Sequence, residues 1–170
     1  MEPKEFKVRY KRSLPKGVSS KFVKYKKNYI DKLSLSPVDR AMLLRVGLPE
    51  SAAPFIHFEA LDDNELTAID HLVPNKNRYY IIGSNGSGDA IAIDSVNGHV
   101  VYFNHDSGLE MVLMNSSIET LAECICLYME NWKTTNPDEL LTKLLNADPM
   151  LKESNGFWIT EIEILKDEIS

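Results

Sequence analysis

Three glycines lie within six positions of the segment YYIIGSNGSGDAIAID at 79–94, between two runs that predict strands. A glycine loop binds phosphate when it leads from a strand into a helix whose first amides point at the anion. Here Asp89 and the β-branched run AIAID follow, which predict a second strand. Asn85-Gly86 is instead the favoured pair for a two-residue hairpin turn, in which both residues adopt positive φ. The pattern predicts a hairpin, with a nucleotide- or small-molecule-binding loop over Gly83–Asp89 as the alternative.

Histidines and acids offer a second possible chemistry near the same strands. His99 and His105 fall on one face of a predicted strand, but six strand residues span about 20 Å, too far for shared chemistry. Asp106 begins an Asp-Ser-Gly run that is typical of a turn. The serines of the glycine loop lie between strands and not on the strand-to-helix elbow of a hydrolase. We therefore expect no catalytic site and no enzyme activity.

The two cysteines, Cys124 and Cys126, lie in a predicted helix, where a spacing of two turns their side chains apart. They are expected to be reduced core residues. A Cys-x-Cys pair supplies only two of the four ligands of a structural zinc, and no His follows at a useful spacing. The sequence predicts neither a metal site nor a cofactor.

Charge divides the chain into two parts. Residues 1–32 carry eleven Lys or Arg against three Asp or Glu, which leaves 8 against 22 in residues 33–170. In KFVKYKKNYIDKL at 21–33 the lysines interleave with apolar residues, as in a solvated amphipathic helix. We expect 1–32 to be a basic helical extension of the same domain as 33–170. The acidic body opposes nucleic acid, and the sequence shows neither a membrane-length apolar run nor a secretory signal, so we expect a cytoplasmic protein.

Turn and cap signals place the elements that would position these residues. Ser36 can cap a helix over about 37–46, which Gly47 ends, and the acidic run EALDDNEL at 59–66 is predicted to be a loop. Four short runs at hairpin spacings then predict an antiparallel meander: RYYIIG, AIAID, HVVYFNH and LEMVLM.

Helices are predicted after the strands. A capping box from Ser116 to Glu119 begins the first, which reaches Trp132, and a second begins at Asn136-Pro137 and stops before Asp148. The segment 157–169 fits a helix better than a strand. A chain of 170 residues suits one domain. The fold class is α+β, with helices covering one face of an antiparallel meander.

Taken in order, RVGLPESAAPFIHFE (45–59), the hairpin segment 79–106 and a capped helix ending at Trp132 resemble the SUKH superfamily, over about residues 33–150. The resemblance implies an α+β SUKH-like domain without a catalytic centre. Superfamily members include bacterial immunity proteins that bind and neutralise a cognate toxin, often a nuclease, and a yeast regulator of glucan synthesis. A cell-wall-type regulatory scaffold is therefore a further alternative. The resemblance to the superfamily also implies a structural role for the hairpin residues Gly83, Gly86, Gly88, Asp89 and Asp94.

The acidic body favours a cationic protein partner, such as a nuclease toxin, over nucleic acid or a membrane. Acidic residues before the meander and around its second strand could meet on one rim of the sheet. We therefore expect partner contacts at Asp62, Asp63, Glu65, Asp89 and Asp94.

Overall fold

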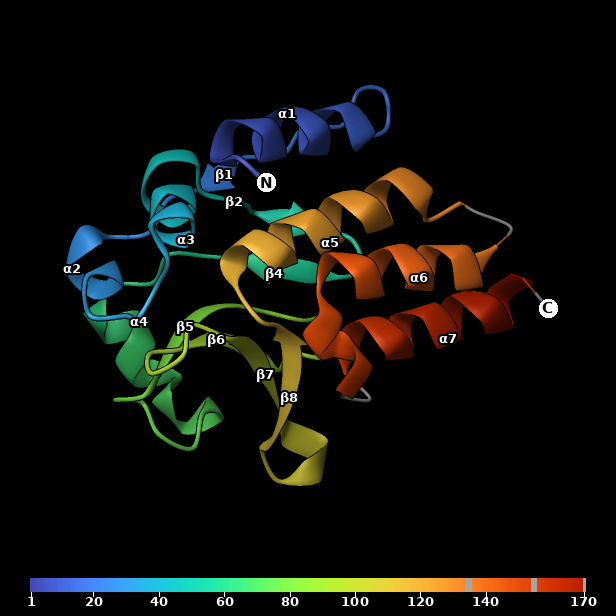
Figure 1. Ribbon diagram of the computed structural model, residues 1–170. Helices are drawn as coiled ribbons and strands as arrows, with labels where there is room; N and C mark the ends of the chain where they lie inside the picture. Colours follow the sequence, from blue (N-terminus) through green and yellow to red (C-terminus); the bar gives the residue numbers. More distant parts are fainter. Residues whose placement is uncertain (134–135, 154–155, 170) are drawn as a thin grey trace.

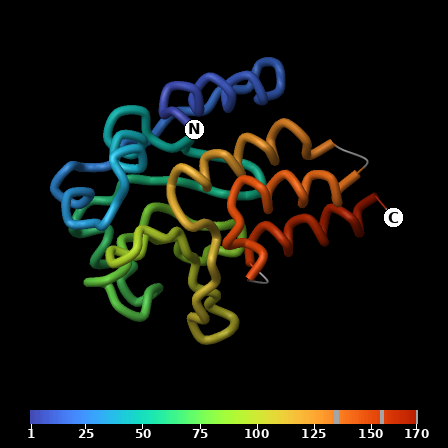
Figure 2. Tube along the Cα trace, in the orientation of Figure 1, coloured from blue at the N-terminus to red at the C-terminus, as the bar shows by residue number. Residues whose placement is uncertain are grey.

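Helices and strands form an α+β architecture in a computed structural model that describes residues 1–133, 136–153 and 156–169 (Figure 1; Figure 2 traces the chain). This is the fold class that the sequence predicts. The α-helices are α1 (Pro3–Ser13), α2 (Lys27–Ile30), α3 (Pro37–Ala41), α4 (Asp63–Ala68), α5 (Ile118–Asn131), α6 (Pro137–Ala147) and α7 (Phe157–Ile169). Short π or 3-10 turns are η1 (Met42–Val46), η2 (Asp70–Leu72), η3 (His105–Ser107) and η4 (Pro149–Glu153). The strands are β1 (Phe22–Val23), β2 (Leu48–Pro49), β3 (Ser51–Ala52), β4 (Ile56–Phe58), β5 (Tyr79–Ser84), β6 (Ala90–Asp94), β7 (Val100–Asn104) and β8 (Glu110–Asn115).

The main sheet is an antiparallel meander in which β3 to β8 each pair with their neighbour in the chain. The predicted strands β5, β6, β7 and β8 are confirmed. The β5–β6 register shifts between Ile81 and Gly83, as at a β-bulge. A Cβ on Gly83 would clash with the carbonyl oxygen of His57 in β4. Glycine at 83 therefore permits the close approach of two strands.

One face of the sheet packs against α5, α6 and α7, which lie side by side in Figure 1, with α1 packed on α5. All three predicted C-terminal helices, including 157–169, are confirmed within the described residues. Cys124 and Cys126 are free thiols inside this core, as predicted, and burial raises the pKa of each to about 12.

The start of α5 lies one residue later than predicted. Ser117 is the N-cap: its hydroxyl accepts from the Thr120 amide, and the Thr120 side chain accepts from the Ser117 amide. Glu119, the predicted partner in the capping box, instead donates its backbone N–H to Asp39 at 2.7 Å. Either of the neighbouring residues Ser116 and Ser117 could be the N-cap by sequence alone. The contact between Glu119 and Asp39 joins distant parts of the chain, so the local sequence does not show it.

A buried polar network anchors α7. The Asn115 side chain donates to the Asp148 carboxylate at 3.0 Å and accepts from the Trp158 indole at 2.8 Å. The same Asp148 oxygen accepts from the Ser116 amide at 2.7 Å and from Thr120 Oγ1 at 2.9 Å. Fully buried polar groups are costly unless paired, so this network fixes how β8, α5 and α7 meet.

The other face of the sheet has its own smaller core, which differs from the expectation of helices on one face only. The segment around α4 and η2 packs Leu61 and Val73 against Ile81, Val101 and other strand residues. The predicted loop over 59–66 is wrong in its second half, because Asp62 caps α4 in a capping box with Glu65. Amides of residues 64 and 65 bind the Asp62 carboxylate at 2.9 Å.

The basic extension is packed on the body. In α1, Phe6 and Tyr10 join the main core, and Arg9 binds Glu123 at 2.7 Å and Glu130 at 2.9 Å on α5. The predicted amphipathic helix over 21–33 is wrong, since residues 22–23 pair with β2 and only the four-residue α2 is helical. Gly47, at φ +85°, ends the α3–η1 helix as predicted, and any Cβ there would strike the backbone of Val23.

Candidate functional site

The glycine loop between β5 and β6 is a turn that the Asn85 side chain organises. Its carbonyl oxygen accepts from the amides of Ser87 at 3.0 Å and Asp89 at 2.9 Å, and the Gly88 amide donates to the Asn85 backbone oxygen. These amides are therefore already occupied and not free to hold a phosphate. The predicted two-residue turn is wrong: Gly88 has the positive φ, +83°, and Gly86 does not. Glycine at 86 instead makes room for Phe55, whose Cβ would lie 2.8 Å from an added Cβ.

The acids that follow the turn are buried and bonded. Asp89 is 5% exposed and accepts from the His105 amide at 3.0 Å and the Asn85 side chain at 2.8 Å. Asp94 is 2% exposed and binds Arg78 at 2.8 Å and the Val96 amide at 3.0 Å. They lie at opposite ends of β6. The predicted acidic rim is therefore wrong at Asp89 and Asp94, because both carboxylates are occupied inside the fold.

The acids at 62, 63 and 65 are exposed but also have local partners. Asp62 and Glu65 bond each other's backbone at the start of α4, and Asp63 accepts from the hydroxyl of Tyr29. These hydrogen bonds leave the charges accessible to solvent. The structure does not bring the three acids together with Asp89, which lies at the far end of β6.

Histidines at 99 and 105 do not share a strand, because β7 spans only Val100–Asn104 and His105 begins η3. His105 Nδ1 lies 2.6 Å from the Asp89 carboxylate, and Nε2 lies 3.3 Å from Asp106. The hydrogen bond with Asp89 and then the charge of Asp106 raise the pKa of His105. Within the described residues, no three His, Cys, Asp or Glu side chains gather as a metal site would require.

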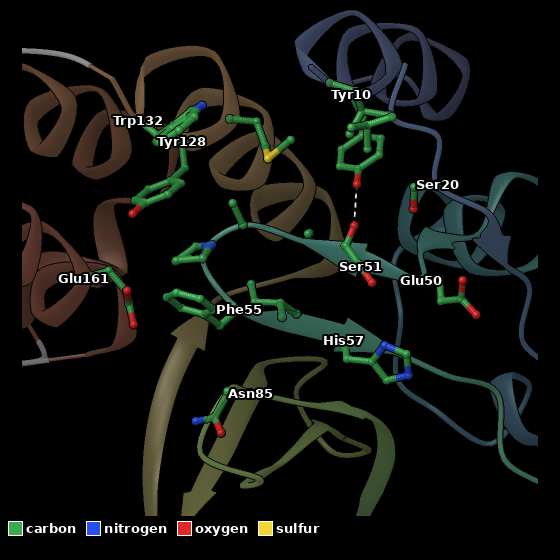
Figure 3. Close-up of a pocket in the computed structure, with 18 of the residues that line it drawn as sticks. Tyr10, Ser20, Glu50, Ser51, Phe55, His57, Asn85, Tyr128, Trp132 and Glu161 are labelled. Carbon is green, nitrogen blue, oxygen red and sulfur yellow. Dashed lines mark hydrogen bonds between the residues drawn. The ribbon is translucent and has the colours of Figure 1, made fainter. Parts of the chain in front are cut away.

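A groove of about 850 Å³ lies elsewhere, among parts of the chain that are far apart in sequence (Figure 3). One wall is the end of α1 with the segment after it, and the second is the β3–β4 hairpin with the turn at 85–86. The end of α5 and one face of α7 complete it. The Tyr10 hydroxyl donates to the Ser51 carbonyl oxygen and joins the first two walls. No pattern in the sequence predicts this groove.

Apolar side chains are exposed around the groove. Phe55, at the tip of the β3–β4 hairpin, is 80% exposed and has φ of +52°. A non-glycine residue at positive φ costs about 1–3 kcal/mol and tends to mark a functional position. Trp132, the C-cap residue of α5, is 43% exposed, and Ile164 on α7 is 48% exposed. Large apolar side chains that are exposed around one groove are typical of a protein-binding surface.

The α7 wall is acidic. Glu161 is half-buried, and burial followed by the nearby charge of Glu168 raises the pKa of its carboxyl to about 7. In Figure 3, Glu161 lies across the groove from Phe55 and below Tyr128. Burial first, then Glu161 and Glu168, raise the pKa of Tyr128 to about 12. Among the described residues that line the groove, Glu50, Glu161 and Glu168 carry carboxylates, and none is Lys or Arg.

The sequence model of the SUKH-4 immunity protein family matches residues 21–158. The chain belongs to the SUKH-4 immunity protein family. This confirms the resemblance to the SUKH superfamily and supports a role in toxin immunity. Comparisons with curated proteins and with solved structures gave no significant match. No helix in the described part of the chain is long and apolar enough to cross a membrane.

Only part of the groove's lining lies within the range that the SUKH-4 model matches. Its β3–β4 hairpin and the end of α5 lie within residues 21–158, whereas α1 and the acidic residues of α7 lie outside that range. Sequence reasoning could have found one signal, the run Ala-Ala-Pro-Phe at 52–55, as an apolar hairpin tip. It could not have placed α1 and α7 beside it.

Proposed function

We propose that this SUKH-4 protein binds a cognate toxin in the cytoplasm and neutralises it without catalysis. The observation that carries the proposal is the family match over residues 21–158. The immunity proteins of this family act as partners of toxins, and a partner needs an accessible binding surface. We take the groove beside Phe55 to be this surface, since exposed apolar side chains line it and Glu161 and Glu168 lie on its α7 wall.

The toxin's chemistry follows from charge. The body at 33–170 carries 22 acids against 8 bases, and the 11 bases of residues 1–32 are partly neutralised by contacts such as that of Arg9 with Glu123. An acidic surface accelerates association with a cationic protein and opposes nucleic acid. We therefore propose a cationic toxin, with a nuclease as the leading class because nucleases grip phosphate with basic residues. Asp62, Asp63 and Glu65 remain proposed contributors to this attraction.

The test is co-expression with the protein encoded beside this gene. We expect rescue of growth and a complex that survives size-exclusion chromatography. A variant with Phe55→Ala should give weaker rescue, whereas Val96→Ala, at an exposed apolar residue outside the groove, should rescue like the parent. Failure of the parent to bind or rescue against its neighbouring gene product and against a panel of cationic nuclease toxins would refute the proposal.

A further inference from the structure

The α7 side of the groove combines charge and apolar surface in one stripe. Glu161, Ile164 and Glu168 are three and four residues apart, which places them on one face of a helix. The apolar side chain of Ile164 thus lies between two carboxylates. Across the groove lie Phe55 and Trp132, with their rings partly exposed.

We propose that the groove binds an extended segment of the partner in which a Lys or Arg lies next to a large apolar side chain. The cation would lie between Glu161 and Glu168, and the apolar side chain would pack among Phe55, Trp132 and Ile164. This inference rests on the proposed function in taking the natural partner to be a protein toxin, and it adds which chemistry on that toxin is recognised.

Charge complementarity argues for this occupant. The described part of the groove's lining has three carboxylates and no Lys or Arg, so an acidic segment would meet like charges without a Lys or Arg to offset them. Lys133, which is not part of the groove's lining, lies over the Trp132 ring, with Nζ 4.8 Å from the ring centroid. Coulomb attraction between a cation and the half-buried Glu161 is stronger than at an open surface, because the effective dielectric constant is lower there.

The protonation of Glu161 gives the inference a second consequence. Its pKa of about 7 arises from burial and from Glu168, and the titratable groups facing it from other elements are Tyr128 on α5 and Tyr102 on β7. Both tyrosines are neutral near pH 7, because a tyrosine hydroxyl ordinarily titrates near 10 and burial, the first cause, raises the pKa of each further. A bound cation favours ionised Glu161, so binding should release a proton. Affinity should therefore rise with pH up to about 7 and then level, at most about tenfold per unit.

The experiment selects peptides from a displayed random library on the intact protein, which does not require the toxin to be known. Parallel selections use Glu161→Gln with Glu168→Gln, Phe55→Ala, and the control Glu163→Gln, an exposed acid of α7 outside the groove. Thermal melting checks that each variant is folded. We expect sequences that pair Lys or Arg with Leu, Ile, Phe or Trp, and at least a tenfold loss of affinity in both groove variants but not in the control. Calorimetry in two buffers of different ionisation enthalpy should detect the proton release.

Three results would overturn the inference: selection of acidic or purely polar peptides, equal binding by the groove variants, or no selected peptide at all. If the toxin is captured equally by parent and groove variants, the groove inference is wrong and the immunity function stands. If cationic-apolar peptides are selected while no toxin is bound or neutralised, the proposed function is wrong and the groove inference stands. A second copy of this chain as occupant would appear as a concentration-dependent dimer that the Phe55→Ala variant disrupts, and would also count against the inference.

Discussion

The imidazole Nδ1 of His105 lies 2.6 Å from the carboxylate of Asp89, so the end of β7 is bonded to the β5–β6 turn. Burial alone would raise the pKa of Asp89, but the hydrogen bonds from the His105 amide, the Asn85 side chain and the His105 ring lower it overall. The pKa of His105 is raised, chiefly by the hydrogen bond with Asp89. The charged pair is thus favoured in the folded state.

The first prediction is a pH-dependent loss of stability in His105→Gln. The contribution of His105 is complete below its ordinary pKa of about 6.5 and fades as pH rises through its raised folded value. That of Asp89 is complete above its ordinary pKa of about 3.9 and fades as pH falls through its lowered value. The Tm of the variant should therefore fall below the parent most at pH 5–6, by about 2–4 °C, and less at pH 8. His71→Gln, at an exposed residue of η2, is the control, and a pH-independent difference would contradict the prediction.

A second prediction concerns Glu161→Gln. In the folded protein the pKa of Glu161 is raised to about 7, whereas in the unfolded chain a Glu ionises near pH 4.3. Glu161 therefore begins to destabilise the folded state near pH 4.3, and this destabilisation is complete above pH 7. Removing the charge should raise Tm at pH 8 by about 2–4 °C and leave it nearly unchanged at pH 4. The matched Glu163→Gln should show neither effect. An unchanged Tm at pH 8 would mean that Glu161 is better solvated than the groove geometry indicates.

Alanine substitutions can distinguish a glycine that is needed for the close approach of two strands from one that is needed for its positive φ. Gly83→Ala would force β4 from β5 and should cost about 1–3 kcal/mol or more in free energy of unfolding. Gly88→Ala has open space but φ of +83°, so about 1 kcal/mol is expected. Gly17→Ala, also at positive φ in open space, is the control for Gly88 and should behave alike. Urea unfolding measures all three, and a mild Gly83→Ala would show that the strands can adjust.

The acids at the start of α4 have two roles that can be tested separately, the capping of the helix and the proposed attraction of a cationic toxin. Reversing Asp62, Asp63 and Glu65 to Lys should remove the cap and cost about 0.5–2 kcal/mol of stability. Neutralisation to Asn, Asn and Gln keeps cap-forming oxygens and should preserve stability. If these acids attract the toxin, both sets should slow its association, and salt should slow the parent likewise, since charges are screened beyond about 8 Å at physiological ionic strength. A salt-insensitive rate would place the contact elsewhere.

Phe55 should show opposite effects on stability and on binding. Its ring is exposed and its backbone has positive φ, so Phe55→Gly should raise the free energy of unfolding by about 1 kcal/mol. Phe55→Ala removes the ring without relieving the backbone and should leave stability nearly unchanged. Both should weaken toxin binding by about thirtyfold, the effect of a hot-spot side chain. Binding that survives in both variants would remove Phe55 from the interface.

Elements with a local signal could be predicted from the sequence. The strands β5 to β8 have alternating or apolar runs with Gly and Asn turns between them. N-cap residues begin α5 and α6, and all of α5 to α7 have a helical apolar period. Asp62 and Glu65 also formed a readable capping box, but the acidic composition of the segment favoured a loop. Two-residue strands such as β1 and β2 leave no period to detect, and only their pairing reveals them.

The candidate site was harder because it depends on distant parts of the chain. Asp89 and Asp94 looked like surface charges, since no sequence pattern shows that His105 and Arg78 lie beside them. The groove joins residues near 10–20, 50–57, 128–132 and 161–168, and no local rule brings these together. Exposure and positive φ at Phe55 likewise become visible only in the folded backbone.

The docking of α1 on α5 also sets an order of events during synthesis. Arg9 and its partner Glu123 are 114 residues apart, and at about 5–20 residues per second α1 waits roughly ten seconds for its partner to be made. The β5–β8 meander pairs only neighbours and can form meanwhile. Because the groove needs both the end of α1 and residues up to 168, nascent chains should remain unable to bind until α7 has left the ribosome. Protection against a toxin would then lag behind translation of the sheet, and a slow codon run before α7 would lengthen that delay.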